Sequence, residues 1–134
     1  MKKIILTLLF TTLLFGKFTT LSTKQTQDMI KKGVVIIDIR RLDEFKKYGI
    51  IKTAHTLTFF DTQGQYNIPA WLKNFTKIIK NKSTPFIIYC AHANRSKVVG
   101  KFLSEQLHYQ NVYELDGGII YGWIDKGLKT VKYQ

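Results

Sequence analysis

The sequence predicts an α/β domain with a mainly parallel sheet flanked by helices. From Phe18 onward, short apolar runs alternate with segments of helical periodicity, which is the pattern of βαβ units. Residues 34–39 and 85–90 are near-continuous apolar runs, as expected for strands covered on both faces. With 134 residues, 45% of them hydrophobic, the chain is long enough for one such domain and too short for two.

The other elements follow from local signals. Ser22 or Thr23 can cap the first helix, and Gly33 can stop it. Pro69 suits the first turn of a later helix, whose apolar residues recur every three or four positions. In the first half, from Ser22 onward, we therefore expect these elements in order: a helix from the cap at Ser22 or Thr23 to residue 32, a strand over 34–39, a short helix over 42–48, a strand over 54–60, a polar loop over 61–67 and a helix from Pro69 to residue 79.

The second half repeats this rhythm. We expect a buried strand over residues 85–90, a helix over 95–109, a last strand over 111–115 and a closing helix over 119–126 around Trp123. Six residues of the long helix should fall on one face: Val98, Val99, Phe102, Leu103, Gln106 and Leu107.

The N-terminal segment, residues 1–16, has the layout of a signal peptide. Lys2 and Lys3 precede a stretch of apolar residues and threonines over 4–15, and Gly16 follows it. As a helix this stretch would cover about 18 Å, less than the ~30 Å hydrocarbon core of a membrane, so we expect no stable transmembrane span. The sequence predicts export, to the periplasm, and a mature domain over 18–134. An uncleaved membrane tether is the alternative.

Composition restricts the partners and cofactors. The formal charge is +12, but only three of the 21 basic residues are arginines, the residue that most often reads nucleic acid. We therefore expect no nucleic-acid partner and a preference for small anionic substrates. One cysteine and three scattered histidines can form neither an internal disulfide nor a structural zinc site, so no metal is expected.

The chemistry is expected at Cys90, the only cysteine, which follows a buried strand and precedes a helix. Open α/β sheets place their ligands at this edge. Loop N–H groups and the helix dipole stabilise negative charge there, which favours the thiolate form of a cysteine and makes Cys90 a candidate nucleophile. Arg95 can fold back toward an anionic substrate or the sulfur. The alternative is a buried cysteine that acts as a small hydrophobe.

Three motifs resemble those of the rhodanese family of sulfurtransferases. Residues 35–40, Val-Ile-Ile-Asp-Ile-Arg, are followed by Glu44-Phe45 and resemble the family segment V-x-L-I-D-V-R…E-F/Y. Residues 49–54 stand in the place of G-H-I-P-G-A. The loop over 90–96 is similar to C-R-x-G-x-R-S, and residues 116–118 with Trp123 resemble the terminal G-G-x-x-x-W.

This resemblance implies a rhodanese-like three-layer fold with a five-stranded sheet and a thiosulfate sulfurtransferase activity through a persulfide on Cys90. The donor would be a small anion such as thiosulfate, and the acceptor a thiol, cyanide or a protein, with no cofactor. The residues implied to bind substrate and persulfide are Ala91, His92, Ala93, Asn94, Arg95 and Ser96. Asp38 and Arg40 would support the loop, with an ordinary surface salt bridge as the alternative.

Several positions depart from the family pattern. Ala93 replaces the usual loop glycine, so it is expected to keep φ below zero. Ala91 replaces a residue that is often basic in members that use thiosulfate, and His92 can contact substrate or face solvent.

Two rival functions stay open. A related phosphatase or arsenate reductase would have arginine six positions after its cysteine, whereas Arg95 is five positions after Cys90. A non-catalytic sulfur carrier or binding module would keep the same fold.

Overall fold

The computed structural model describes residues 16–134, so the predicted signal segment lies outside the described residues except for Gly16. The described chain forms one sheet in which neighbouring strands are all parallel, in the order β1-β5-β4-β2-β3. Its strands are β1 (Lys17–Leu21), β2 (Val35–Asp38), β3 (His55–Thr56), β4 (Phe86–Tyr89) and β5 (Asn111–Leu115). The predicted α/β fold class is confirmed.

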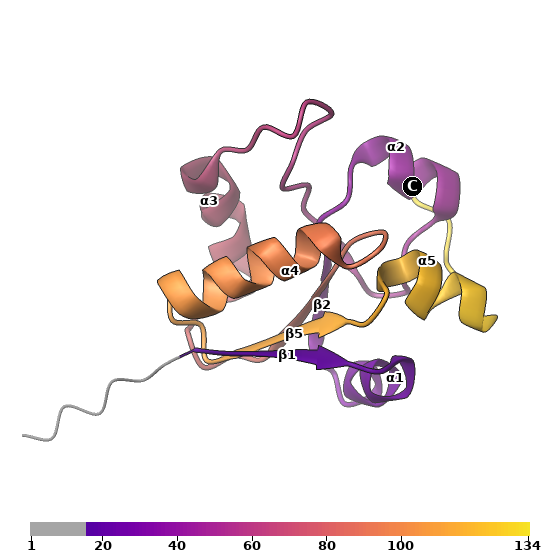
Figure 1. Cartoon of the computed structure of the whole chain (residues 1–134), viewed down its shortest axis with the longest axis horizontal. Coiled ribbons are helices and arrows are strands. Elements are labelled where there is room, and N and C mark those ends of the chain that lie inside the picture. Colours follow the sequence, from indigo (N-terminus) through magenta and orange to yellow (C-terminus); the bar gives the residue numbers. More distant parts are fainter. Residues whose placement is uncertain (1–15) are drawn as a thin grey trace, which may run out of the picture.

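Helices cover both faces of the sheet. Figure 1 shows α3 and α4 over one face and α1 under the other. The helical elements are α1 (Thr23–Lys31), α2 (Leu42–Tyr48), α3 (Ile68–Ile78), α4 (Asn94–Lys101), the π-helical turn η1 (Phe102–Gln106), α5 (Gly118–Gly122) and the 3-10 turn η2 (Ile124–Lys126). Within residues 16–134, none of these helices is long and apolar enough to cross a membrane.

The core is split into two layers by the alternation of side chains along the strands. Ile37 and Ile88 contribute to the cluster that packs against α3 and α4, which also contains Cys90. Ile36 and Ile87 contribute to the cluster on the opposite face, against α1 and α5. Both faces of the central strands are therefore dry, which explains why residues 34–39 and 85–90 are apolar at successive positions.

The first two helices lie close to the predicted positions. The Ser22 hydroxyl accepts a hydrogen bond from the Gln25 N–H at 3.1 Å, and the Ser22 N–H donates to the Gln25 side chain at 2.9 Å. These reciprocal bonds cap α1. The second helix, α2, covers residues 42–48 as predicted and ends at Gly49, which has a φ of 74°.

The strand predicted over residues 54–60 is wrong in its second half, because β3 covers only two residues. The Thr58 hydroxyl donates to the carbonyl of Arg40 at 2.6 Å, and the carbonyl of Leu57 accepts the indole N–H of Trp71 at 3.0 Å. The N–H groups of Leu57 and Phe59 still donate to the carbonyls of Asp38 and Ile39 at 2.8 and 3.2 Å, so the segment continues beside the end of β2 without forming a regular strand.

The helix predicted over residues 95–109 changes character part way along. After Lys101 the chain continues as the π-helical turn η1, which inserts an extra residue and rotates the side chains that follow. Ser104 is buried as a result, and Gln106 is exposed. Val98 is 61% exposed, at the rim of the buried face. Val98 and Gln106 therefore do not share the burial of Val99 and Leu103, with which the sequence placed them on one face.

The predicted closing helix is two short pieces. Trp123 separates α5 from η2, and its φ of −134° and ψ of −68° lie outside the helical region. Its indole N–H donates to the carbonyl of Lys129 at 2.9 Å, and its ring is buried. The break in the helix accommodates this buried side chain.

The turn before α5 brings two backbones into close contact. The N–H groups of Ile119 and Ile120 donate to the carbonyls of Cys90 and Ala91 at 2.9 and 3.0 Å. Gly118 makes this approach possible, because a Cβ at this residue would lie 2.4 Å from the carbonyl oxygen of Ala91. Its φ of 65° also favours glycine.

We expect Gly118→Ala to lower the free energy of unfolding by about 2 kcal/mol or more, measured by urea denaturation. The left-handed conformation alone costs about 1 to 2 kcal/mol in a residue with a Cβ, and the backbone clash adds to it. Gly127→Ala is the matched control, since Gly127 has a φ of 80° but open space around it. Equal losses in the two variants would contradict a role for the close approach.

Candidate functional site

Cys90 lies directly after β4, at the start of the loop that leads into α4. Its sulfur accepts a hydrogen bond from the backbone N–H of Ser96 at 3.3 Å. In the thiol form it donates to the Ser96 hydroxyl, at 3.5 Å. The side chain is only 1% exposed. The predicted position, between a buried strand and a helix N-terminus, is confirmed.

The loop side chains differ in what they can do. Ala91, Ala93 and Ser96 are buried, Arg95 is half-buried, and His92 and Asn94 are exposed. The methyl groups of Ala91 and Ala93 offer no polar contact, so these residues could bind a ligand only through their backbone. Of the six predicted binding residues, Ser96 is the one whose side chain contacts the sulfur.

The expectation that Ala93 keeps φ below zero is wrong. Its φ is 69°, in the left-handed region, and it occupies the N-cap position of α4. The loop must reverse direction here to enter α4, and the turn requires a positive φ whichever residue occupies it. Alanine adopts this conformation at a cost of about 1 to 2 kcal/mol, which a glycine would avoid.

Arg95 points to a carboxylate of α2. Its Nη1 and Nη2 donate to the two oxygens of Glu44 at 2.8 and 2.7 Å, a bidentate ion pair. In the sequence Glu44 is visible only as part of a family motif, and this contact was not predicted. No local pattern could have found it, because the two residues are 51 positions apart in the sequence.

The hydrogen bonds of this ion pair shift the pKa of both groups. Burial alone would raise the pKa of Glu44, but the hydrogen bonds from Arg95 and from the Arg41 N–H lower it from 4.5 to about 2. The same pairing raises the pKa of Arg95. Both groups are therefore charged at neutral pH, and the Arg95 guanidinium is occupied by Glu44.

Asp38 and Arg40 form a fully buried ion pair rather than a surface salt bridge. Both side chains are 0% exposed, and Arg40 Nη2 and Nε lie 2.6 and 2.9 Å from the carboxylate oxygens of Asp38. Arg40 Nη2 also donates to the carbonyl of Gly49 at 2.7 Å. Burial alone would lower the pKa of Arg40, but the hydrogen bonds and charge of Asp38 outweigh it and raise the pKa.

A second carboxylate near the sulfur was not predicted. Glu114, on β5, is fully buried and its Oε2 accepts a hydrogen bond from the Ser96 hydroxyl at 3.0 Å. Lys97 and Thr20 contact its other oxygen. A glutamate inside a strand that is otherwise mostly apolar was the signal that could have found it.

A pocket of about 350 Å³ lies between α2 and the Cys90 loop, and Ala91 and His92 line it, whereas Cys90 itself does not. Its lining includes Arg41, Glu44, Lys47, Tyr48, Ala91 and His92. The imidazole of His92 packs against the Tyr121 ring, with centroids 4.7 Å apart. The pocket therefore carries charges of both signs at its mouth and an exposed histidine at its rim.

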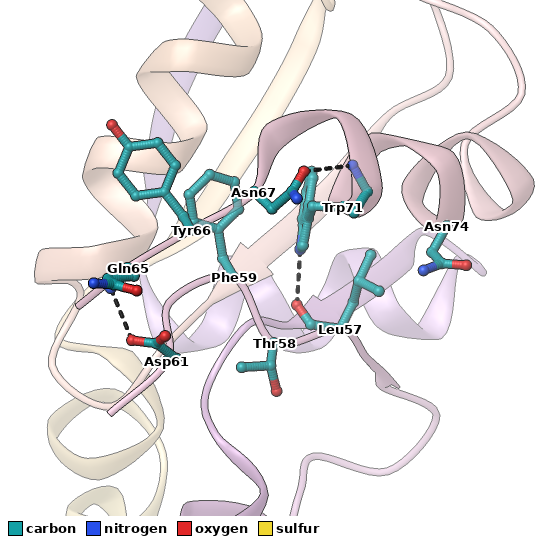
Figure 2. Close-up of a pocket in the computed structure, with 10 residues that line it drawn as sticks. Leu57, Thr58, Phe59, Asp61, Gln65, Tyr66, Asn67, Trp71 and Asn74 are labelled. Carbon is teal, nitrogen blue, oxygen red and sulfur yellow. Dashed lines mark hydrogen bonds between the residues drawn. The ribbon is translucent and has the colours of Figure 1, made fainter. Parts of the chain in front are cut away.

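A larger pocket, of about 540 Å³, lies elsewhere, beside α3. Figure 2 shows Phe59, Tyr66 and Trp71 grouped at its wall, with dashed lines from Trp71 to Leu57 and between Asp61 and Gln65. The polar groups that line this pocket thus form hydrogen bonds with the surrounding loop. The pocket is not lined by the Cys90 loop, so the candidate site stays at Cys90.

Curated relatives share most of the chain. The thiosulfate sulfurtransferase GlpE of Tolumonas auensis is 31% identical over 109 residues, covering 81% of this chain and 90% of its own. The rhodanese-like domain-containing protein 17 of Arabidopsis thaliana is 28% identical over 122 residues, covering 82% of this chain and 70% of its own.

A solved structure supports the fold. The rhodanese-related protein of Thermoplasma volcanium superposes with a TM-score of 0.64 at 24% identity, covering 86% of this chain and 99% of its own. The family model of the rhodanese-like domain matches residues 22–125 of this chain. The predicted rhodanese-like fold is confirmed, and the chain belongs to the rhodanese-like domain family.

Proposed function

We propose that this protein is a sulfurtransferase that carries a sulfane sulfur on Cys90. The observation that carries the proposal is the sulfur at the end of β4, which accepts the Ser96 N–H at the start of α4. A helix N-terminus and its free N–H groups stabilise negative charge, so they favour both a thiolate and a persulfide. The relative named thiosulfate sulfurtransferase supports this activity class.

The reaction balances without a cofactor or an oxidant. The Cys90 thiolate attacks the outer sulfur of thiosulfate, the sulfur–sulfur bond of the donor breaks, and sulfite leaves with the electron pair. Cys90 then carries a persulfide, Cys–S–S⁻. A thiol, cyanide or a protein acceptor attacks the outer sulfur, and the thiolate of Cys90 is released.

The pocket beside the Cys90 loop is compatible with this cycle. The donor is a small anion, and Arg41, Lys47 and His92 line the pocket together with the carboxylates of Asp43 and Glu44. Its volume of about 350 Å³ accommodates a molecule of that size. The Sγ atom of Cys90 is almost fully buried. The acceptor must therefore be slim enough to reach the sulfur, or the loop must open locally.

Incubation of the purified protein with thiosulfate should add about 32 Da, one sulfur atom, to Cys90, as measured by intact mass spectrometry. The reason is that the thiolate of Cys90, once formed, accepts a sulfane sulfur as a stable covalent intermediate. Cys90→Ser should gain nothing. A protein that gains no mass from thiosulfate or from polysulfide would contradict the enzyme proposal and favour a non-catalytic binding module.

The Glu44–Arg95 pair bears on how the donor would be held. Because Glu44 takes one N–H from each terminal nitrogen of Arg95 and neutralises its charge, the guanidinium attracts a substrate anion less strongly. Backbone N–H groups of the loop then carry more of the binding. The spacing of five positions between Cys90 and Arg95, one fewer than in the phosphatase loop, favours sulfur transfer over phosphatase chemistry.

The pair also predicts a pH dependence of stability. The pKa of Glu44 is about 2 in the folded chain and near 4.5 when unfolded. The contribution of Glu44 to the free energy of unfolding is therefore complete above pH 4.5 and is lost as the pH falls toward 2. We expect Glu44→Gln to lower the urea unfolding free energy at pH 7 and to converge with the wild type near pH 2.

Glu105→Gln serves as the control, since Glu105 is exposed and forms no ion pair within residues 16–134. Its unfolding free energy should run parallel to that of the wild type from pH 7 to pH 2. If Glu44→Gln also ran parallel, the pair would not contribute to folding stability.

We propose in addition that the protein is exported and cleaved near Gly16. The charged start and the short apolar stretch before Gly16 support this. The first strand begins at Lys17, so cleavage there would leave every strand whole. Sequencing of the protein from a cell fraction outside the cytoplasm should give an N-terminus near Lys17. Recovery of the full-length chain from the cytoplasm alone would contradict export.

A further inference from the structure

We propose that Glu114 is a positioning residue that controls, through Ser96, whether Cys90 keeps its proton. This inference deepens the proposed function and rests on it, since it concerns the reactive sulfur of that cycle. It assigns a role to a fully buried carboxylate that the cycle described above does not use.

Glu114 reaches the site from the neighbouring strand. Its two oxygens have separate partners. Oε1 accepts the Thr20 hydroxyl at 2.9 Å and contacts the Lys97 ammonium, whereas Oε2 accepts the Ser96 hydroxyl at 3.0 Å. Ser96 is therefore the partner of Oε2, and the carboxylate is held rigidly from its other side.

The hydroxyl of Ser96 has one proton and several acceptors around it. The Oε2 atom of Glu114 lies at 3.0 Å, the carbonyl of Ala93 at 3.2 Å and the sulfur of Cys90 at 3.5 Å. A buried carboxylate is the strongest of these acceptors. The proton therefore points to Glu114, and the lone pair of Ser96 faces the thiol, which donates to it.

This arrangement favours the thiol in the resting protein. If Cys90 loses its proton, the sulfur becomes an acceptor and Ser96 must turn its hydroxyl away from Glu114 to donate to it. Oε2 is then left without a donor inside the protein, which is costly. Glu114 thus opposes formation of the free thiolate.

The persulfide has no such conflict. Its negative charge lies on the outer sulfur, so the inner sulfur places little demand on Ser96, and the hydroxyl can stay on Glu114. The network would therefore favour the loaded state over the empty thiolate. Glu114 would keep the unloaded cysteine protonated and would not oppose its conversion to the persulfide.

Other charges around the sulfur are paired. Arg95 is bound to Glu44, Arg40 to Asp38, and Lys97 to Glu114 itself. The exposed His92 belongs to the same loop. A substitution of Glu114 leaves the first two pairs intact, and Lys97, which is 46% exposed, can turn to solvent.

The test is Glu114→Gln, assayed by the rate of iodoacetamide alkylation of Cys90 from about pH 5 to 9. The carbonyl oxygen of the glutamine should stay with Thr20 and Lys97, so its NH₂ donates to Ser96 and directs the Ser96 proton to the sulfur. We expect alkylation about tenfold faster at pH 6, because a hydrogen bond to the thiolate is gained.

A double-mutant cycle with Ser96→Ala separates this effect from the simple loss of a charge. The glutamine should change the alkylation rate by less than about twofold when Ser96 is absent. Thr20→Val, which removes a contact to Oε1 but leaves Oε2 in place, is the matched control and should react like the wild type. An unchanged rate in Glu114→Gln, or an equal gain without Ser96, would overturn the proposal.

If Glu114→Gln fails to fold, Lys97→Met tests the same network from the surface of α4. Without the ammonium, the carboxylate should attract the Ser96 proton more strongly, and alkylation should slow in a manner that requires Ser96. Alkylation does not depend on sulfur transfer. A protein without sulfurtransferase activity would therefore fail the mass test with thiosulfate and could still pass this one.

Discussion

The buried ion pair of Asp38 and Arg40 fixes the edge of the sheet on which the site is built. It lies at the end of β2, next to β4, and Arg40 also binds the carbonyl of Gly49 and lies 5.5 Å from the centre of the Phe45 ring. One guanidinium thus joins a strand end, a helix and a turn. Removal of one partner would leave an unpaired buried charge, which typically costs about 3 to 5 kcal/mol.

The position of α2 transmits this constraint to the Cys90 loop. With Phe45 against Arg40, the preceding residue, Glu44, faces α4 and binds Arg95. On the other side, the start of α5 donates two backbone hydrogen bonds to the carbonyls of Cys90 and Ala91. The loop is therefore held at both ends by contacts that do not involve the sulfur. With the loop held in this way, Sγ can gain or lose a proton or a sulfane sulfur without movement of the backbone.

The sequence was sufficient for features set by local patterns. The apolar strands, the cap at Ser22, the end of α2 at Gly49 and the place of Cys90 all follow from neighbouring residues. Contacts between distant segments could not be derived in this way. Glu44 and Arg95 are 51 positions apart, and only the packing of α2 beside α4 brings them together. The expectation of a negative φ at Ala93 was wrong for a related reason, because the geometry of the turn overrides the preference of the residue.

Charge near the sulfur is balanced in pairs, and this has a consequence for the chemistry. Arg40, Arg95 and Lys97 each bind a carboxylate, so a negative charge on a persulfide of Cys90 would meet the backbone dipoles of the loop more than a free cation. Dipoles stabilise a thiolate without forming a tight ion pair with it. A sulfur carrier must release its cargo as readily as it accepts it, and a strong ion pair would retain the charged persulfide. The paired carboxylates therefore suit the proposed transfer function, since they keep the sulfur stabilised but exchangeable.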